Sequence, residues 1–300
     1  MERQRRLIPG TLWPAILRQT DHALGCGALR PIDTQQCRID SGGIRFLVRQ
    51  VSSLTHKEQQ RDQAHKLQTA KRPQANPFLP PDPDLFVADI SDTHLALLNK
   101  FNVIDHHLLI VTREFEPQEA LLDLADFEAL LACMAEFDGI GFYNAGTEAG
   151  SSQPHKHLQI VPLPLGDADP PVPIEPLLGA QDRVPELPFW HAFVRFEADD
   201  LTRADAPKLA LSRYRTLLEA AGVGALEIDR AWCHAAPYNL LVTRCWMLLV
   251  PRSRERVEGV SVNALGFAGS LFVRDAAQLD VIERLGPMTV LERAALPANT

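Results

Sequence analysis

Two histidines and a glutamine alternate along one short segment of the 300-residue chain. His155, His157 and Gln159 are separated by single residues, so an extended strand would direct all three side chains to the same face. Lys156 and Leu158 would then face the opposite side. Neutral imidazole is a good nucleophile near pH 7 because its unperturbed pKa is about 6.5. The segment could therefore carry a histidine that attacks phosphorus, held in one tautomer by a neighbour that bonds its other ring nitrogen.

A run of small and hydroxyl-bearing residues, NAGTEAGSSQ over 144–153, precedes the histidines. Its glycines and serines permit a flexible turn with free N–H and O–H donors, which suits an anionic ligand such as phosphate. Two histidines at i and i+2 could also form half of a metal site. However, Gln159 is a poor transition-metal ligand and no cysteine pair stands nearby. We therefore expect an anion-binding site without a protein-bound metal.

Composition and charge limit the class of protein. The chain is 46% apolar and 23% charged, which is ordinary for a globular protein that builds a sizeable core. Its net charge of −8 disfavours a nucleic-acid binder with a broad basic surface. No run approaches the ~20 apolar residues of a membrane helix, and no signal peptide is evident. The five cysteines include no C-x-x-C pair, so we expect a reduced, cytoplasmic setting without nucleic-acid or membrane partners.

The elements that must position the histidine segment can be predicted from apolar spacing. The short apolar runs between residues 85 and 161 are interrupted by one long helical pattern, 118–137. This arrangement predicts an α+β fold, with that helix packed on one face of a largely antiparallel sheet. Residues 56–76 are polar and predict an exposed loop, whereas 76–84 and 162–188 are proline-rich and predict extended or crossing segments. The predicted strands are 44–51, 85–90, 94–101, 107–112, 140–144, 157–161, 189–197, 238–243 and 246–250, the last two as a hairpin. The predicted helices are 11–24, 118–137, 206–221, 278–285 and 288–295.

The run GSSQPHKHLQ, residues 150–159, resembles the active-site signature of the diadenosine tetraphosphate (Ap4A) phosphorylases. These enzymes, also called ATP adenylyltransferases, form a branch of the histidine-triad (HIT-like) superfamily beside galactose-1-phosphate uridylyltransferase. Residues 76–87, 94–122, 238–252 and 262–274 also resemble family segments, so the resemblance covers most of the chain from about residue 44. It implies a HIT-like α+β fold. The expected parts are an N-terminal helical segment (1–43), a catalytic core (44–187) and a C-terminal adenylyltransferase region (188–300) packed on that core.

The resemblance implies that His157 is the nucleophile and that His155 supports it. Hydrolase branches have a third histidine at the position of Gln159, whereas transferases have glutamine. A glutamine amide donates and accepts hydrogen bonds but does not titrate, which favours transfer to phosphate over transfer to water. The expected reaction is phosphorolysis of Ap4A to ADP and ATP, and its reverse, through an adenylyl-histidine. A non-catalytic dinucleotide sensor and a HIT-type hydrolase are the alternatives.

The resemblance also assigns contacts to the substrate. Gly266 and Ser270 have an alternative role in close packing, and Arg274 has one as a surface charge. The expected ligands are Ap4A, ATP, ADP and phosphate, with Mg²⁺ screening the polyphosphate and no organic cofactor. The preferred dinucleotide, the acceptor anion (phosphate or sulfate), the oligomeric state, the role of the polar loop 56–76 and the presence of a structural metal stay open. The residues expected to bind substrate are Lys57, Asn99, Lys100, Asn144, Gly150, Ser151, Ser152, Gln153, Gln159, Gly266, Ser270 and Arg274.

Overall fold

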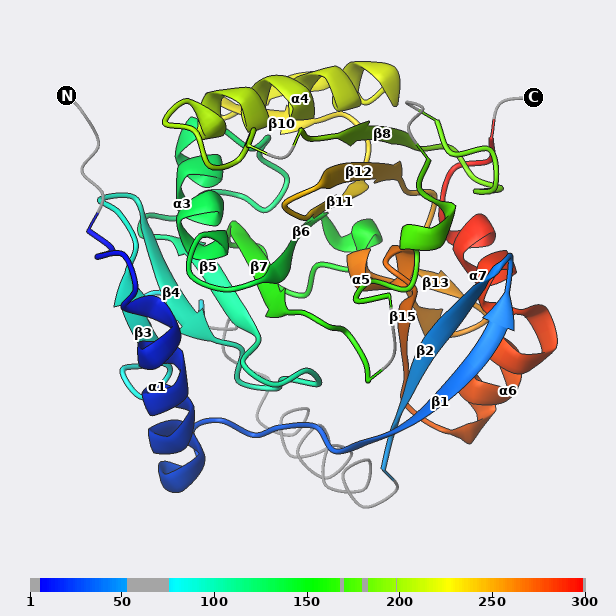
Figure 1. Cartoon of the computed structure of the whole chain (residues 1–300), viewed down its shortest axis with the longest axis horizontal. Helices are drawn as coiled ribbons and strands as arrows, with labels where there is room; N and C mark the ends of the chain where they lie inside the picture. The colour runs from blue at the N-terminus through cyan, green and yellow to red at the C-terminus, as the bar shows by residue number, and fades with distance from the viewer. Residues whose placement is uncertain (1–5, 53–75, 168–169, 180–182, 198, 299–300) are drawn as a thin grey trace.

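An eight-stranded antiparallel sheet organises the computed structural model, which describes residues 6–52, 76–167, 170–179, 183–197 and 199–298. The strand order is β3-β4-β5-β7-β6-β11-β12-β8, so the histidine-bearing strand β7 lies near the middle (Figure 1). Both neighbours of β7 are hydrogen-bonded to it, which fixes the direction of its alternating side chains. The strands are β3 (Phe86–Asp89), β4 (His94–Leu98), β5 (Leu108–Thr112), β6 (Gly139–Ala145), β7 (His157–Pro162), β8 (Ala192–Arg195), β11 (Tyr238–Val242) and β12 (Trp246–Pro251).

Three helices cover one face of this sheet. α1 (Leu12–Cys26) contacts β3 and β4, α3 (Leu124–Met134) contacts β4, β6 and β7, and α4 (Ala206–Ala220) contacts β8 and β12. The side chains of Leu158 and Ile160 on β7 are buried in the core beneath these helices. His157 and Gln159 alternate with them, so they point to the opposite face. The predicted division of polar and apolar residues along this strand is confirmed.

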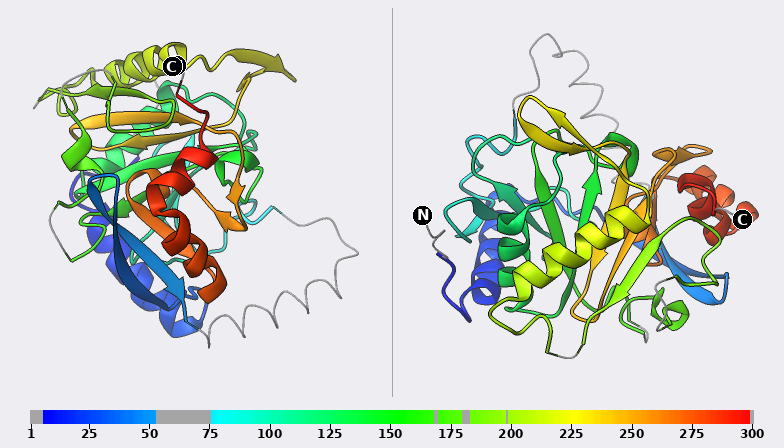
Figure 2. Two further views of the ribbon diagram at one scale, coloured as in Figure 1. Left: turned by 90° about the vertical axis from the view of Figure 1, so that its right-hand side faces the viewer. Right: turned by 90° about the horizontal axis from the view of Figure 1, so that it is seen from above.

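A second, three-stranded sheet lies across the helix-free side and joins distant parts of the chain. β1 (Thr34–Ser41) pairs antiparallel with β2 (Ile44–Val51), and β15 (Ser270–Val273) pairs parallel with β2. Helices α6 and α7 lie beside this sheet, and the hairpin β9–β10 extends away from the main sheet (Figure 2). The bounds are α5 (Ala264–Phe267), α6 (Ala276–Leu285), α7 (Pro287–Ala294), β9 (Ala225–Ile228), β10 (Ala231–His234), β13 (Arg256–Val257) and β14 (Val260–Ser261).

Most predicted elements are present, but some bounds differ and several short elements were not predicted. The helix predicted over 118–137 spans only Leu124–Met134, because the Asp123 side chain caps it by accepting from the backbone N–H groups of Ala125 and Asp126. The first helix continues past its predicted end to Cys26 and ends at Gly27 in a left-handed conformation. Strand β1 was not predicted, because Cys37 and Ile39 are its only apolar residues. The short elements β9, β10, β13, β14, β15 and α5 were not predicted either. Residues 56–75 of the predicted polar loop lie outside the described residues.

Among the described residues, no helix is both long enough and apolar enough to cross a membrane.

Candidate active site

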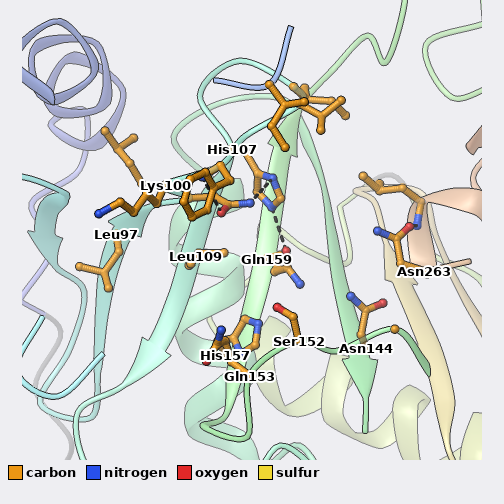
Figure 3. Close-up of a pocket in the computed structure, with 18 of the residues that line it drawn as sticks. Leu97, Lys100, His107, Leu109, Asn144, Ser152, Gln153, His157, Gln159 and Asn263 are labelled. Atoms are coloured by element: carbon orange, nitrogen blue, oxygen red, sulfur yellow. Dashed lines mark hydrogen bonds between the residues drawn. The ribbon is translucent and has the colours of Figure 1, made fainter. Parts of the chain in front are cut away.

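A cavity of about 780 Å³ opens on the helix-free face of β7. It lies between the main sheet and the β2–β15 pair, so strands from both sheets contribute its walls. Its volume falls within the range of ordinary small-molecule sites. Figure 3 shows His157 and Gln159 on one side and Asn144 and Asn263 across from them. The polar lining residues are Arg49, Asp82, Asn99, Lys100, His107, Asn144, Ser152, Gln153, His157, Gln159, Asn263 and Ser270.

One ring nitrogen of His157 is hydrogen-bonded, and the other has its lone pair free. Its Nδ1 lies 2.8 Å from the carbonyl oxygen of His155, and because a carbonyl only accepts, Nδ1 carries the proton and donates. Nε2 is therefore the nitrogen with a free lone pair. His157 as a whole residue is 4% exposed and lines the cavity, so this lone pair lies at the surface that a ligand would meet. Burial lowers the pKa of His157 to about 4, so the ring is neutral at pH 7.

Gln118 holds the backbone on which this histidine is mounted. Its Oε1 accepts from the His157 backbone N–H at 2.9 Å, and its Nε2 donates to the Asn144 carbonyl at 3.0 Å. The Gln118 side chain is 1% exposed, so both bonds are shielded from water. The segment that was wrongly predicted as helix therefore runs alongside the site and supports it.

His155 does not line the cavity, and its side chain bonds to groups outside the lining. Its Nδ1 accepts from Asn76 at 2.9 Å, and its Nε2 donates to the Thr112 carbonyl at 2.9 Å. The Phe78 ring packs against both histidine rings, with centroids 5.6 Å from His155 and 5.3 Å from His157. His155 therefore acts on His157 through its main-chain carbonyl, which selects the His157 tautomer.

The depressed pKa of His157 has a measurable consequence. In the unfolded chain the ring binds a proton below about pH 6.5, whereas in the folded chain it binds one only below about pH 4. Folding therefore loses stability from this residue as pH falls from about 6.5 towards 4, and keeps it fully above that window. A histidine-resolved NMR titration should give a folded-state pKa for His157 well below 6. A midpoint at 6.5 or above would contradict the buried, neutral ring.

The glycine–serine segment forms a turn packed against the C-terminal part of the chain. Gly150 has a φ of +93°, and a Cβ at this position would lie 3.1 Å from both the Val262 carbonyl oxygen and Asn263 Cβ. Both the backbone conformation and the close approach require glycine. Ser151 turns inward and donates to the Gln153 carbonyl at 3.0 Å. Ser152 and Gln153 remain at the cavity wall, where their donors can meet an anion.

A buried arginine fixes the orientation of Asn144. Arg252 is donor-only, so the Asn239 atom 2.5 Å from its guanidinium is the amide oxygen. Asn239 Nδ2 then donates to Asn144 Oδ1 at 2.8 Å, and the Ala264 backbone N–H donates to the same oxygen at 2.9 Å. The Asn144 amide nitrogen is consequently left to face the cavity. Burial lowers the pKa of Arg252 to about 9, which leaves it cationic at pH 7.

Gln159 is held in a similar way by His107. The His107 Nε2 lies 2.9 Å from Gln159 Oε1, and His107 Nδ1 lies 3.1 Å from Asn99 Nδ2 (Figure 3). Burial lowers the pKa of His107 to about 4, so this ring is also neutral and has one donor and one acceptor nitrogen. The two amides of Asn144 and Gln159 therefore have occupied oxygens and free nitrogens towards the cavity.

A buried ion pair anchors the other face of β7. Lys156 Nζ lies 2.6 Å from Asp126 on α3 and 3.1 Å from Glu116. Burial by itself would raise the pKa of Asp126, but Lys156 and His94 more than offset this and lower it. The pair thus stays charged and ties the histidine strand to the helix beneath it.

The structure brings together most of the predicted site residues. Lys57 lies outside the described residues, and four others are absent from the cavity lining: His155, Ser151, Gly266 and Arg274. Gly266 packs closely, since a Cβ there would lie 3.0 Å from Val262, and Arg274 is exposed. The predicted residues that do line the cavity are Asn99, Lys100, Asn144, Gly150, Ser152, Gln153, His157, Gln159 and Ser270.

Several supporting residues were missed because each is a single polar residue in an apolar or unremarkable context. Arg252 ends the apolar run WMLLVP, and that break in hydropathy was the one available signal. Gln118 and Asn239 carry no spacing that marks them. The remaining omissions among the cavity residues are Arg49, Asp82, His107 and Asn263.

The described cavity is better suited to an anion than to a resident metal ion. Asp82 is its sole carboxylate, and three of the four ring nitrogens of His155 and His157 already have partners. His22, Cys26 and Asp84 bring possible ligand atoms within 4.8 Å of one another, but they belong to α1 and the segment before β3, outside the lining. Hard cations such as Mg²⁺ favour several oxygen ligands that include carboxylates, and the described walls offer a single carboxylate.

Comparison with solved structures shows that the chain has a HIT-like α+β fold. Yeast Ap4A phosphorylase Apa2 in complex with AMP superposes with a TM-score of 0.77 at 23% identity, covering 97% of this chain and 98% of that one. The complex of the same yeast enzyme with Ap4A gives 0.76 at 22% identity, covering 98% and 100%.

Sequence comparison narrows the class to a family. Residues 2–180 match the Ap4A phosphorylase N-terminal domain, and residues 185–297 match the ATP adenylyltransferase C-terminal domain. The chain belongs to the Ap4A phosphorylase family. Diadenosine 5',5'''-P1,P4-tetraphosphate phosphorylase 2 of Saccharomyces cerevisiae is 29% identical over 239 residues, 68% of this chain and 70% of the relative. Protein APA1 of the same yeast is 29% identical over 206 residues, 60% of this chain and 61% of the relative.

Proposed function

We propose that the protein cleaves P1,P4-bis(5'-adenosyl) tetraphosphate by phosphorolysis, giving ADP and ATP, and that it catalyses the reverse reaction. The observation that carries this proposal is the open Nε2 of His157, which faces a cavity whose walls present amide and hydroxyl donors. The names of the relatives and of the AMP and Ap4A complexes support the same substrate.

The first step transfers an adenylyl group to the protein. The lone pair of His157 Nε2 attacks the α-phosphorus of one AMP moiety and forms the P–N bond. The bridging P–O bond breaks, and its electron pair leaves with ATP. The positive charge that develops on the ring is stabilised at Nδ1–H by the His155 carbonyl, 2.8 Å away. Donors from Asn144, Ser152 and the Gly150 turn are placed to hold the charge on the phosphoryl oxygens.

The second step returns the group to phosphate. An oxygen of inorganic phosphate attacks the adenylyl phosphorus, the P–N bond breaks, and its electron pair returns to Nε2 as ADP leaves. Gln159 has no titratable proton, so it offers an attacking water no general base, whereas its amide nitrogen can bind a phosphate oxygen. Each in-line displacement inverts the configuration at phosphorus, so the two successive displacements should leave that configuration unchanged. We further propose that Mg²⁺ enters with the polyphosphate, and that the enzyme acts in the cytoplasm on its nucleotide pool.

Product analysis tests this assignment directly. Purified enzyme incubated with Ap4A should give ADP and ATP in equal amounts when phosphate is present. Without phosphate it should give one burst of ATP, equal to the enzyme concentration, with adenylylated His157 left behind. Liquid chromatography of the nucleotides measures both results.

Two outcomes would contradict it. AMP plus ATP formed at full rate in water would indicate a hydrolase. Tight Ap4A binding with no burst of ATP would indicate a sensor.

A further inference from the structure

The amide of Gln159 is the end of a chain of hydrogen bonds that begins at a backbone N–H. The Phe101 N–H donates to Asn99 Oδ1 at 3.4 Å, which leaves Asn99 Nδ2 to donate to His107 Nδ1 at 3.1 Å. A neutral imidazole that accepts at Nδ1 carries its proton at Nε2. His107 Nε2 then donates to Gln159 Oε1 at 2.9 Å.

The direction of this chain is set at its origin. A backbone N–H can only donate, so Asn99 cannot rotate its amide by 180° without placing an NH₂ group against that N–H. If Asn99 were reversed, every later bond would reverse as well and Gln159 would present its oxygen to the cavity. The fixed order therefore makes Gln159 a hydrogen-bond donor to the ligand, although an isolated glutamine could present either group.

The orientation of this amide matters for the acceptor. Phosphate presents oxygens that accept hydrogen bonds, so an NH₂ group binds it while a carbonyl oxygen repels it. Water, in contrast, can donate to a carbonyl oxygen. The tautomer of His157 is set separately, by the His155 carbonyl. The attack by His157 is therefore prepared by the His155 carbonyl, whereas the use of phosphate depends on the orientation of Gln159.

We propose that His107 is a positioning residue that makes the adenylyl-enzyme selective for phosphate by holding Gln159 as a donor. This inference rests on the proposed function, because it requires an adenylylated His157. His107 acts through Gln159 and takes no direct part in either displacement. Its loss should therefore leave adenylyl transfer to His157 intact and weaken the use of phosphate.

Two isosteric variants separate this role from simple packing. In His107→Gln the amide nitrogen occupies a position equivalent to Nε2, so the bond to Gln159 is kept. In His107→Asn the side chain reaches a position equivalent to Nδ1, so contact with Asn99 is kept and the bond to Gln159 is lost. The asparagine variant should raise the KM for phosphate by ~10- to 100-fold, the range for one hydrogen bond to a charged group. It should also increase the AMP share of the products.

The glutamine variant should stay within ~3-fold of the wild type. Single-turnover formation of adenylyl-His157, measured without phosphate, should change less than ~3-fold in both. In a Gln159→Leu background, His107→Asn should add no further increase in the KM for phosphate, because the group through which it acts is gone. If the asparagine variant fails to fold by thermal melting, His107→Phe keeps the ring volume and carries the same expectations.

The proposal would be overturned if the two variants changed the KM for phosphate equally, or if adenylylation and phosphate use fell together. Additive effects of His107→Asn and Gln159→Leu would also overturn it. These results are distinct from failure of the proposed function, which would appear in the wild type as the absence of adenylylated His157 or of phosphate-dependent ADP.

Discussion

Replacing His157 by alanine should reduce Ap4A cleavage by on the order of 10⁴-fold or more, because the variant has no atom that can form the P–N bond. The fold should survive, since the ring makes one side-chain hydrogen bond, to the His155 carbonyl, and otherwise faces the cavity. The measurements are the turnover rate with phosphate present and the mass of the protein after incubation with Ap4A. Wild-type enzyme should gain one adenylyl group, and the variant none.

A matched control is available on the surface. His22 is exposed on α1, where it contacts Asp84, and His22→Ala should leave both the rate and the adenylylated mass unchanged. If His157→Ala retained more than about one hundredth of the wild-type rate, another nucleophile or direct attack by phosphate would have to be considered. The adenylyl-histidine pathway would then be wrong.

Replacing Arg252 by methionine should lower the free energy of unfolding by about 3–5 kcal/mol, the scale expected when several buried acceptors lose their donor together. Arg252 is 2% exposed. Its guanidinium donates to the Asn239 side chain and to the carbonyls of Val262 (2.8 Å), Arg254 (2.8 Å) and Ala294 (3.1 Å). Methionine fills similar space but donates to none of them. Urea unfolding measures the loss.

The same variant should weaken nucleotide binding in the fraction that remains folded. Without Arg252, Asn239 can rotate and need no longer donate to Asn144 Oδ1, so the Asn144 amide is held in its orientation by the Ala264 N–H alone and less firmly. Arg45→Met is the control, because this arginine is exposed and pairs with Asp40 at the surface, where water screens the ion pair and its loss should change the free energy of unfolding little. Equal losses of stability in the two variants would contradict the role assigned to Arg252.

Patterns that repeat along the chain were sufficient to predict much of the fold. The strands beside His157 and the hairpin after Tyr238 are short, nearly continuous apolar runs that are buried on both faces, and such runs can be recognised in a sequence. On β7 the polar residues His157 and Gln159 alternate with buried apolar residues, which indicated which side chains share a face. The helix predicted from Gln118 was wrong at its start, because Leu121 and Leu122 continue the helical spacing of the apolar residues while Asp123 places the cap after them. A local capping bond outweighed the hydrophobic pattern.

The site was predictable to the extent that its residues are contiguous. Residues 150–159 contain the turn, His157 and Gln159, so one segment indicated the chemistry that we propose. The orientation of each amide was not predictable, because it depends on partners such as His107 and Arg252 that are 52 and 108 positions away. Donor and acceptor polarity is a property of three-dimensional networks, and nothing in local spacing encodes it.

The parallel pairing of β15 with β2 also orders events during biosynthesis. Strand β7, which carries His157, leaves the ribosome long before residues 263–273, which supply Asn263 and Ser270 to the opposite wall. A nascent chain that ends between these points can form the histidine strand but not an enclosed site. Nucleotide capture should therefore begin only once β15 has been made, so that an incomplete polypeptide does not sequester adenine nucleotides.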